Sequence, residues 1–545
     1  MRPVDSPLYY KNLYRTMNGY AAPNSSRKRE ESPNLLDEKA ILDVEGDAGR
    51  ADTERKAPIL KWADPTWTSM SGVRSVSWRA AMLRTGFFLL PSFVQSRLSR
   101  DHRLRSEKLS PTAYLDGMRG LAAFFVFFCH YFYTCFVIVN GYGYGEDNYH
   151  ILQLPFIRLF YSGPPMVCVF FVISGYALSY RPLKLMRSRN SEGFATTMTS
   201  FVFRRAMRLF LPTAISTFMV VILLRLGLYE WTRDFARDKT YMRNVQENHP
   251  WRTQTTTAQI RDWAWNMFKF LHIWGWEKFG GSTGYDVHLW TIPVEFRASM
   301  MLFLTLIGTA RLRTGIRFCV LAAIMWFTYR SDRWEMLLFY CGMVLAELDI
   351  IRGAHSNPAT TAALPVVEQT STSLLSPQSP STVRRGRSRP LGWIGLSILA
   401  LYLMSQPDAQ AEETPGWILL TKLIPEWFSD KYRYWQIFGS IIFVLCVSHS
   451  PPWQRVFNTP FVQYFGKISY AIYLMHGPVL HTFGYAIERW AWNITGVEGP
   501  NYLKGFILAA VFIVPLVIWA ADVFWRAVDA PVVRFSKWLE QKCSV

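Results

Sequence analysis

The sequence predicts an all-α polytopic membrane protein with about ten transmembrane helices and with both termini in the cytosol. Half of the 545 residues are hydrophobic, and the apolar residues form long blocks. Lysines and arginines, which give a formal net charge of +19, gather beside those blocks. This distribution is typical of positive-inside anchoring and not of a basic face that binds nucleic acid. We therefore expect the lipid bilayer as a partner and no nucleic acid.

The N-terminal region, residues 1–100, is expected to be a disordered cytosolic tail with an interfacial helix. Residues 1–80 are polar and poor in aliphatic side chains, and they lack the pattern of a signal peptide. Residues 84–97 form a short apolar segment between Arg84 and Arg97. This segment is too short to span a bilayer and is suited to lying in the membrane interface.

Apolar blocks of about the length of a membrane span follow along the chain. An upright helix needs about 20 residues to cross the hydrocarbon core, and several of the blocks are shorter than this. The predicted spans are residues 119–139, 164–180, 209–228, 287–308, 316–330, 334–350, 391–405, 434–449, 461–485 and 505–525.

The charges of the connections predict the orientation of the chain. Basic residues crowd the connections after the second and sixth spans, and acidic residues crowd the connection after the seventh. Because basic connections stay in the cytosol, we expect the even-numbered connections there, together with both termini and the tail 531–545. The basic residues are Arg181, Lys184, Arg187, Arg189, Arg204, Arg205, Arg208, Arg384, Arg385, Arg387 and Arg389, and the acidic ones are Asp408, Glu412, Glu413, Glu426 and Asp430.

Two long connections and the cysteines complete the organisation. Residues 229–286 contain several tryptophans among mixed charges, which favours an outer cap on the membrane interface. Residues 353–390 are rich in Ser, Thr and Pro and predict a flexible cytosolic loop. The seven cysteines show neither paired spacing nor metal-ligand spacing, so we expect no disulfide framework and no metal site.

An arginine and a histidine lie within the first predicted span. Ten residues separate Arg119 from His130, so both share one helix face and lie about 16 Å apart along the axis. Asp116 precedes Arg119 by three residues and is placed to orient it. Ionisable groups in hydrocarbon are costly and usually functional. The alternative is a snorkelling arginine together with a histidine that hydrogen-bonds between helices.

A polar stripe opens the fourth predicted span. His288, Thr291, Glu295 and Ser299 recur on one helix face. A carboxylate about 10 Å below the membrane surface needs a partner or a proton, which makes Glu295 a candidate site residue. The alternative is a structural ion pair of Glu295 with Arg297 or with a cation of another span.

The ninth predicted span also carries a polar face. Ser469, Tyr473 and His476 are spaced so that two hydroxyls and an imidazole point in a common direction. Tyrosines near an interface are ordinarily belt residues, so His476 is the least ordinary of the three.

Three arginines follow the second predicted span. Arg204, Arg205 and Arg208 precede the apolar part of the third span. They are either topology anchors or ligands for the phosphates of a nucleotide-containing donor, because guanidinium groups bind phosphate in bidentate fashion.

Five segments together resemble the acyltransferase 3 family of integral membrane acyltransferases. They are LDGMRGLAAFFVFFCH, FFVISGYALS, FRRAMRLFLP, HLWTIPVEF and FGKISYAIYLMHGPV, in the order of that family. The resemblance covers about residues 115–530 and implies one membrane domain over residues 101–530. It implies transfer of an acyl group, often acetyl from a coenzyme A thioester, to a hydroxyl of a carbohydrate, lipid or small metabolite.

The resemblance also bears on single residues. The family's arginine and histidine match Arg119 and His130, and its tryptophan–glutamate motif matches Trp290 and Glu295. The family usually has an acidic residue shortly before FF-x-x-SG, whereas this chain has none between Pro165 and Phe170. The family's extracytoplasmic hydrolase-like extension has no counterpart here, so the membrane domain is expected to work alone or with a partner.

These matches imply a mechanism. His130 is the expected general base, Arg119 is expected to hold the donor or stabilise developing negative charge, and Glu295 is expected to orient the imidazole or the acceptor hydroxyl. A covalent acyl-histidine route stays open. The expected substrate-binding residues are Asp116, Arg204, Arg205, Arg208, Ser469, Tyr473 and His476.

The expected reactants follow from the same resemblance, whereas the expected location is the default for a chain without a recognisable targeting signal. We expect no bound cofactor, an acyl-coenzyme A, acetyl-coenzyme A in particular, as co-substrate, and a hydroxyl-bearing acceptor. The alternative function is a non-enzymatic transporter or lipid-binding membrane protein, because polar stripes in helix bundles also mark permeation routes. The default location for such a chain is the endoplasmic reticulum or another endomembrane rather than the plasma membrane.

Overall fold

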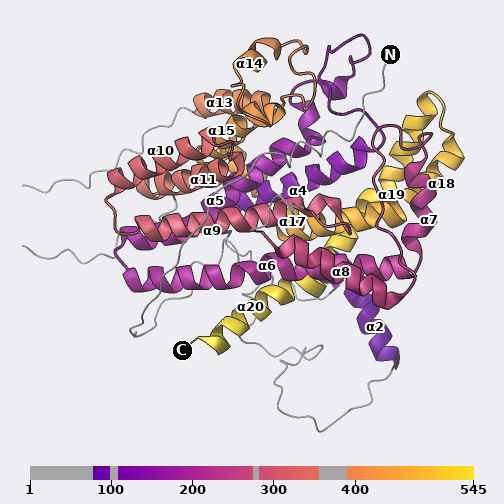
Figure 1. Ribbon diagram of the computed structural model, residues 1–545, viewed down its shortest axis with the longest axis horizontal. Coiled ribbons are helices and arrows are strands. Elements are labelled where there is room, and N and C mark those ends of the chain that lie inside the picture. The colour runs from indigo at the N-terminus through magenta and orange to yellow at the C-terminus, as the bar shows by residue number, and fades with distance from the viewer. Residues whose placement is uncertain (1–77, 99–108, 274–281, 355–389, 545) are drawn as a thin grey trace, which may run out of the picture.

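The structure is a computed structural model of the chain, and it describes residues 78–98, 109–273, 282–354 and 390–544. These residues form helices joined by turns and loops, and no β-strand occurs among them. Most of the long helices run side by side in one bundle, and α20 lies along α6 (Figure 1). The prediction of an all-α fold is confirmed.

The bundle is built from helices of very different length. In the first half of the chain these are α2 (Trp78–Leu89), α3 (Ser92–Leu98), α4 (Ala113–Tyr133), α5 (Gly163–Arg187), α6 (Ser191–Arg225), α7 (Leu228–Arg237) and α8 (Thr256–Leu271). The second half contains η5 (Val287–Trp290), α9 (Thr291–Thr309), α10 (Thr314–Arg330), α11 (Trp334–Ile351), α13 (Pro390–Met404), α14 (Ile418–Lys422), α15 (Tyr434–His449), α16 (Pro451–Phe457), α17 (Pro460–Val479), η7 (Leu480–Gly484), α18 (Tyr485–Thr495), α19 (Pro500–Phe524), η8 (Trp525–Asp529) and α20 (Ala530–Cys543).

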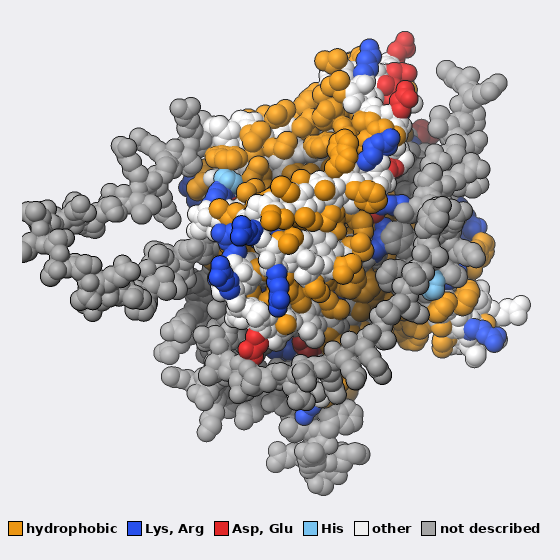
Figure 2. All heavy atoms as spheres, turned by 60° about the vertical axis from the view of Figure 1, so that its left-hand side comes forward, with side chains coloured by type: hydrophobic (Ala, Val, Ile, Leu, Met, Phe, Trp, Pro, Cys, Tyr) orange, Lys and Arg blue, Asp and Glu red, His pale blue; other side chains and the backbone are white. Residues whose placement is uncertain are grey.

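Each predicted span falls on a helix of this bundle. Among the described residues, four segments are long and apolar enough to cross a membrane by length and composition, namely α5, α6, Val287–Thr309 and Pro500–Cys543. Hydrophobic side chains are the most widespread coloured kind among the described residues on the face shown in Figure 2. Large apolar side chains such as Leu304, Phe327 and Val511 are at least 60% exposed. Exposed apolar surface of this extent is a property of a membrane protein.

Helices α4 and α17 form the centre of the site-bearing half of the bundle. They run in the same direction, because Gly120 packs on Gly466 near one end and His130 packs on His476 near the other. A Cβ atom on Gly120 would lie 2.3 Å from the backbone nitrogen of Gly466. Glycine is therefore required for this close approach, which is common between membrane helices. The packing fixes the relative heights of the two histidines.

The polypeptide leaves α17 through an irregular turn. Pro478 lies in the last turn of α17, and the next five residues, Leu480–Gly484, form the π-helical turn η7. A proline lacks a backbone N–H and so removes one hydrogen bond from the helix. A π-helical turn contains one more residue than the equivalent α-helical turn, so the side chains after it point in a different direction. This turn places His481 on the same side as His288, at a ring-centroid distance of 5.8 Å.

Several boundaries differ from the sequence predictions. The first predicted span, 119–139, ends earlier, because α4 stops at Tyr133, where the side-chain amide of Asn244 donates to the carbonyls of Tyr133 and Phe136 over 2.7 and 3.0 Å. The basic connection after the second span is largely helical, since α5 continues to Arg187 and α6 begins at Ser191. Asn190 caps α6 by accepting a hydrogen bond from the backbone of Gly193.

The two ends of the chain are more structured than expected where they are described. The region expected as a tail, 531–545, forms most of α20 up to Cys543. The segment 84–97 forms parts of α2 and α3, and Ser92 of α3 donates to Asp522 of α19 over 2.6 and 2.9 Å. Residues 1–77 and 355–389, which carry the predicted disordered tail and most of the predicted loop, lie outside the described residues.

Candidate active site

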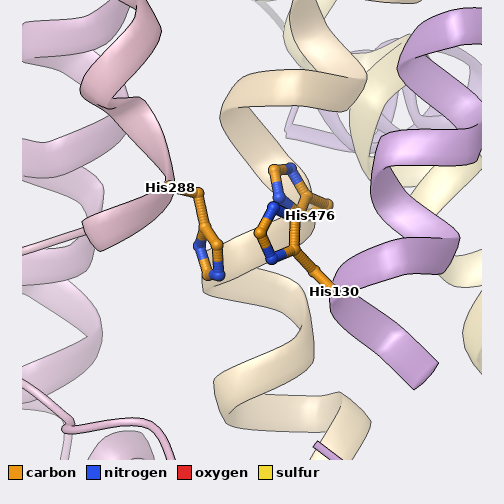
Figure 3. Close-up of side chains that lie close together, drawn as sticks. All are labelled: His130, His288 and His476. Carbon is orange, nitrogen blue, oxygen red and sulfur yellow. The ribbon is translucent and has the colours of Figure 1, made fainter. Parts of the chain in front are cut away.

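Three histidines from distant parts of the chain meet inside the bundle. His130 belongs to the last turns of α4, His288 to η5 and His476 to α17 (Figure 3). The ring centroid of His130 lies 4.1 Å from that of His288 and 5.2 Å from that of His476. His288 and His476 are buried, at 3% and 1% exposed, and His130 is partly buried. His130 and His476 were predicted separately, each on the polar face of its own span, and the structure brings both together with His288.

His288 is clamped between two carboxylates. Its Nδ1 lies 2.8 Å from an oxygen of Asp286, and its Nε2 lies 2.9 Å from an oxygen of Glu247. Asp286 is also the N-cap of η5 and accepts the backbone N–H of His288 over 3.0 Å. A carboxylate only accepts hydrogen bonds, so both ring nitrogens of His288 must carry protons to satisfy this arrangement. The ring is therefore held as an imidazolium.

Glu247 joins a fourth histidine to the cluster. Its second carboxylate oxygen is hydrogen-bonded to Nε2 of His481, which lies in η7. Burial raises the pKa of the Glu247 carboxyl, but the contacts with His288 and His481 outweigh burial and hold this pKa well below its usual range. The pKa of Asp286 is also lowered, since the charge and hydrogen bonds of His288 outweigh the effect of burial. Both acids are therefore ionised at neutral pH.

Three buried imidazole nitrogens in and beside this cluster have no hydrogen-bond partner among the described residues. They are Nδ1 of His130, Nε2 of His476 and Nε2 of His249, whose ring centroid lies 4.9 Å from that of His481. Nδ1 of His476 lies 3.1 Å from the carbonyl oxygen of Ile472, which only accepts, so this nitrogen carries the proton. In the neutral ring Nε2 of His476 is then a bare acceptor. Buried unpaired acceptors are uncommon and mark places where a ligand or a transferred proton is received.

A metal ion is a competing occupant of the same nitrogens. Ligand atoms of His130, His288 and His476 lie within 4.8 Å of one another, and those of Glu247, His288 and His481 do as well. Both nitrogens of His288, however, already lie at hydrogen-bond distance from carboxylates. These contacts have the geometry of hydrogen bonds, so the two carboxylates account for both nitrogens of His288 without an ion.

Arg119 lies away from the histidines, toward the other end of α4. Its guanidinium donates to Asp116 over 2.9 Å, as the spacing of three residues predicts. Its side chain is 35% exposed. The pair therefore occupies a more accessible part of the bundle than the imidazoles, and Arg119 makes no contact with His130.

Glu295 does not contact an imidazole. Its carboxylate accepts hydrogen bonds from Arg205 of α6 over 2.8 Å and from Ser174 of α5 over 3.0 Å. Arg205 also donates to the hydroxyl of Ser299 over 3.1 Å. The pair of Glu295 with Arg205 corresponds to the alternative of a structural ion pair with a cation from another helix. Arg297, the other candidate partner, pairs with Glu335. Asp286 and Glu247, and not Glu295, are the carboxylates that orient an imidazole, namely that of His288.

The three arginines of α6 gather at one small hollow. Arg204, Arg205 and Arg208 line it together with Leu178 of α5 and Phe201 of α6. Arg204 also pairs with Glu540 of α20 over 3.1 Å. The hollow thus combines guanidinium donors with apolar side chains, and α20 forms part of its surroundings.

Of the two hydroxyls predicted on the α17 face, one reaches the histidine cluster. Tyr473 donates to the carbonyl oxygen of His288 and accepts from Thr291 over 2.7 Å, so it supports η5 from α17. Ser469 donates within its own helix to the carbonyl of Gly466 over 3.0 Å. Tyr473 therefore belongs to the support of the site, and Ser469 is a local helix contact.

Sequence reasoning missed Glu247, Asp286 and His481, and it used His288 only as part of a stripe. Asp286 carries a usable signal, because an acid two residues before a histidine at a helix start is suited to cap and orient it. Glu247 has no such signal, since it lies in a connection without periodicity, 41 residues before His288. Its role becomes visible only in three dimensions.

The fold and the site define a helical membrane protein with a buried imidazole–carboxylate centre and a separate cationic hollow. Residues 112–526 match the acyltransferase domain of the acyltransferase 3 family, and the chain belongs to this family. The chain is an acyltransferase, which decides against the transporter and lipid-binding alternatives.

Similar proteins come from fungi. The chain is 33% identical to O-acetyltransferase PaAT-1 of Phomopsis amygdali over 83% of this chain and 88% of that protein. It is 27% identical to acyltransferase R4 of a Phoma species over 77% of this chain and 94% of that protein. It is 25% identical to acyltransferase clz18 of Cochliobolus lunatus over 80% and 97%. The comparison with solved structures gives no significant match.

Proposed function

We propose that this acyltransferase transfers an acetyl group from acetyl-coenzyme A to a hydroxyl of a small metabolite or a lipidic acceptor. The observation that carries the proposal is the unpaired, buried Nδ1 of His130 at the centre of the histidine cluster. The printed name of the relative from Phomopsis amygdali supports acetyl as the acyl group and oxygen as the acceptor atom.

The proposed chemistry is general base catalysis. A hydroxyl is scarcely ionised near neutrality, and an imidazole that takes its proton accelerates attack on a thioester by typically 10²–10⁴-fold. Nδ1 of His130 takes the hydroxyl proton, the hydroxyl oxygen bonds to the thioester carbon, and the carbon–sulfur bond breaks. The proton then passes from His130 to the leaving thiolate, so that an ester and free coenzyme A result.

The donor is proposed to enter from the side of the α6 arginines. Arg204 and Arg208 border the cationic hollow, and guanidinium groups bind phosphate by charge-assisted hydrogen bonds. Arg119 and Asp116 lie on α4 between this side and His130, where Arg119 is proposed to meet the donor. Glu295 is proposed to act by fixing Arg205, and not by direct contact with the acceptor.

The proposed topology has ten membrane spans, cytosolic termini and a multi-pass position in an endomembrane. Support comes from the helices at every predicted span and from the charges of the connections. Residues 1–100, 101–530 and 531–545 are proposed as an N-terminal tail, a membrane domain and a short C-terminal region. The outer cap 229–286 then lies on the acceptor side, and 353–390 lies in the cytosol. No bound cofactor is proposed.

Thiol release from acetyl-coenzyme A by the purified full-length chain tests the proposal. With a panel of small hydroxyl compounds and lipids, we expect release only when a suitable hydroxyl acceptor is present. His130→Ala is expected to lower turnover by about 10² or more without loss of folding. The matched control is His150→Ala, which removes an exposed histidine. Turnover of folded His130→Ala close to that of the unmodified enzyme removes His130 as the base.

A further inference from the structure

The C-terminal helix α20 places a carboxylate against one arginine of the cationic hollow. Glu540 contacts Nε of Arg204 over 3.1 Å, and their side chains are 21% and 12% exposed. Glu540 is the single acidic residue of α20, whose basic residues are Arg534, Lys537 and Lys542. A helix of basic sequence therefore directs its one acid at a cluster of cations. A carboxylate that binds a guanidinium in this way occupies an anion site.

Helical spacing brings Glu540 to this position. Val532, Ser536 and Glu540 recur every four residues and so lie on one face of α20. Val532 and Ser536 are the two buried residues of this helix. Because α20 packs mainly on α6 and on its own preceding turn η8 (Figure 1), the buried face is the face toward α6. Glu540 therefore belongs to the contact surface between the two helices.

The hollow contains a second ion pair, which is tied into the bundle by more contacts. Glu295 accepts hydrogen bonds from Arg205 of α6 and from Ser174 of α5. The side chain of Glu540 has one contact among the described residues, the ion pair with Arg204. Arg204 is therefore the arginine whose carboxylate partner a ligand replaces with the smaller loss of contacts.

Few buried side chains attach α20 to the bundle. Two of its fourteen residues are buried, and the large side chains of Phe535 and Trp538 are 46% and 49% exposed. The π-helical turn η8 precedes α20, and such turns interrupt the regular helix ladder and are frequent at functional sites. An element with few buried contacts opens locally at a low cost in free energy. The helix is therefore suited to move away from α6 when a ligand competes for Arg204.

A phosphate group is the ligand that fits this competition. It carries more negative charge than a carboxylate and binds a guanidinium in bidentate fashion. Among the described residues, the terminal nitrogens of Arg204 have no hydrogen-bond partner, since its contacts with Ser200 and Glu540 both use Nε. These nitrogens are therefore able to receive a phosphate oxygen before Glu540 leaves. The donor of the proposed function carries a diphosphate and a ribose phosphate.

We propose that Glu540 is an internal competitor for the phosphate site of the acyl donor. It holds Arg204 while no donor is bound, and a phosphate group of coenzyme A displaces it together with α20. The inference rests on the proposed function, because it concerns the donor site of the same reaction. The resident carboxylate makes donor binding weaker than an uncompensated arginine would make it.

The test measures donor binding in the full-length enzyme. We expect Glu540→Gln to lower the Kd of coenzyme A and the KM of acetyl-coenzyme A by about threefold to tenfold, because Arg204 then meets the phosphate without a competing anion. S-acetylpantetheine carries the same thioester without the nucleotide phosphates. Its KM is therefore expected to be equal in Glu540→Gln and in the unmodified enzyme.

The matched control is Glu192→Gln, which removes an exposed carboxylate from the first turn of α6. It changes the net charge by the same amount and keeps the pair of Arg204 with Glu540. We expect this control to have the Kd of the unmodified enzyme for coenzyme A.

Amide hydrogen exchange provides a second readout, which does not depend on any variant. Saturating coenzyme A is expected to speed up exchange over Ala530–Cys543 in the unmodified enzyme, because α20 leaves its place on α6. A helix that only packs against the donor site would instead exchange more slowly when the site is filled.

The outcomes that overturn the inference differ from those that overturn the proposed function. An unchanged or higher Kd for coenzyme A in Glu540→Gln overturns the inference, and so does exchange in α20 that slows or stays the same. An equal fall in the KM of S-acetylpantetheine overturns it as well, because the effect would not depend on phosphate. In each case hydroxyl-dependent thiol release still supports the proposed function. If the unmodified enzyme neither binds coenzyme A nor releases thiol, the proposed function fails, and the inference fails with it.

Discussion

At the scale of single residues, the histidines of the site differ in how many of their ring nitrogens are held by hydrogen bonds. His288 has both ring nitrogens in contact with carboxylates, so it is fixed in orientation and in charge. His476 is anchored through one nitrogen to the carbonyl of Ile472. His130 is the least constrained, since its Nδ1 has no partner. In the proposed mechanism, this division lets the fixed rings position His130, the ring proposed to take the proton.

Gly477 leaves the space in which Asp286 and His288 form their contact. A Cβ atom there would lie 2.8 Å from the free oxygen of Asp286 and 2.9 Å from Nδ1 of His288. Gly477→Ala is therefore expected to push the two groups apart and to lower turnover by about 10²-fold, with little change in the KM for the donor. Steady-state kinetics with acetyl-coenzyme A measure both quantities.

The matched control is Gly308→Ala in α9, because no atom lies within 4 Å of a Cβ at that position. We expect the control to retain full turnover and an unchanged melting temperature. If Gly477→Ala also retains full turnover, the contact between Asp286 and His288 is not needed for catalysis.

These residues show how far the sequence leads at this scale. Arg119 and His130 of α4 and His476 of α17 stand out because each interrupts an apolar helix. Helical spacing predicts that Arg119 and His130 share one face of their helix. Asp286 could have been predicted from its position directly before η5, where an acid can cap the helix and orient His288. Glu247 could not be predicted in this way, because it lies in a loop without helical or strand periodicity. Its contact with His288 depends on the tertiary path of that loop.

At the scale of elements, the least expected feature is the pairing of α6 with α20. The sequence predicts a basic connection and a terminal tail, and the structure has two helices instead, joined by the contact of Arg204 with Glu540. The helices at the predicted spans were predictable from the sequence, because long apolar blocks give a clear signal. Helices of mixed charge at the membrane surface, such as the first turns of α6, lack that signal and depend on packing against a neighbour.

The arginines of α6 allow a test of the donor side. Arg204→Gln and Arg208→Gln are each expected to raise the KM for acetyl-coenzyme A by about tenfold, since a charge-assisted hydrogen bond contributes roughly 1.5–3 kcal/mol. The KM for the acceptor is expected to stay within about twofold, and added salt is expected to weaken donor binding. Initial rates at varied donor and acceptor concentrations provide both constants.

Two choices of variant separate phosphate binding from effects on helix packing. Arg205 is left unchanged, because its loss would strand the carboxylate of Glu295 inside the bundle. The control Glu540→Gln removes the partner of Arg204 and keeps every cation of the hollow. A donor KM that rises equally in Glu540→Gln and Arg204→Gln would assign the effect to the packing of α20 and not to phosphate binding.

At the scale of the whole molecule, the proposed topology separates the two substrates. The α6 arginines lie on the side given to the cytosol, where coenzyme A thioesters are abundant, and the cap that supplies Glu247 lies on the opposite side. In this proposed topology, the donor would reach the site between them from one face, and the acceptor from the other face or from within the bilayer. The orientation itself rests on the charges of the connections.

Glycosylation tests this orientation. The sequon Asn493-Ile-Thr495 lies at the end of α18, where Asn493 is exposed, and the sequon Asn24-Ser-Ser26 lies in the N-terminal region outside the described residues. In a eukaryotic host we expect any glycan at Asn493 and none at Asn24. Endoglycosidase treatment of the chain and of Thr495→Ala, compared by gel mobility, makes the assignment. A glycan at Asn24 would reverse the topology.

The close approach of α4 and α17 has a consequence for how the protein is made. Gly120 and Gly466 are in close contact, although 345 residues separate them in the chain. In the proposed topology, α4 therefore enters the membrane with its glycine face uncovered and with His130 lacking His476, until the last sixth of the chain is synthesised. A chain that is cut before α17 is expected to expose this polar, small-residue surface, and we expect membrane chaperones and quality control to recognise the fragment.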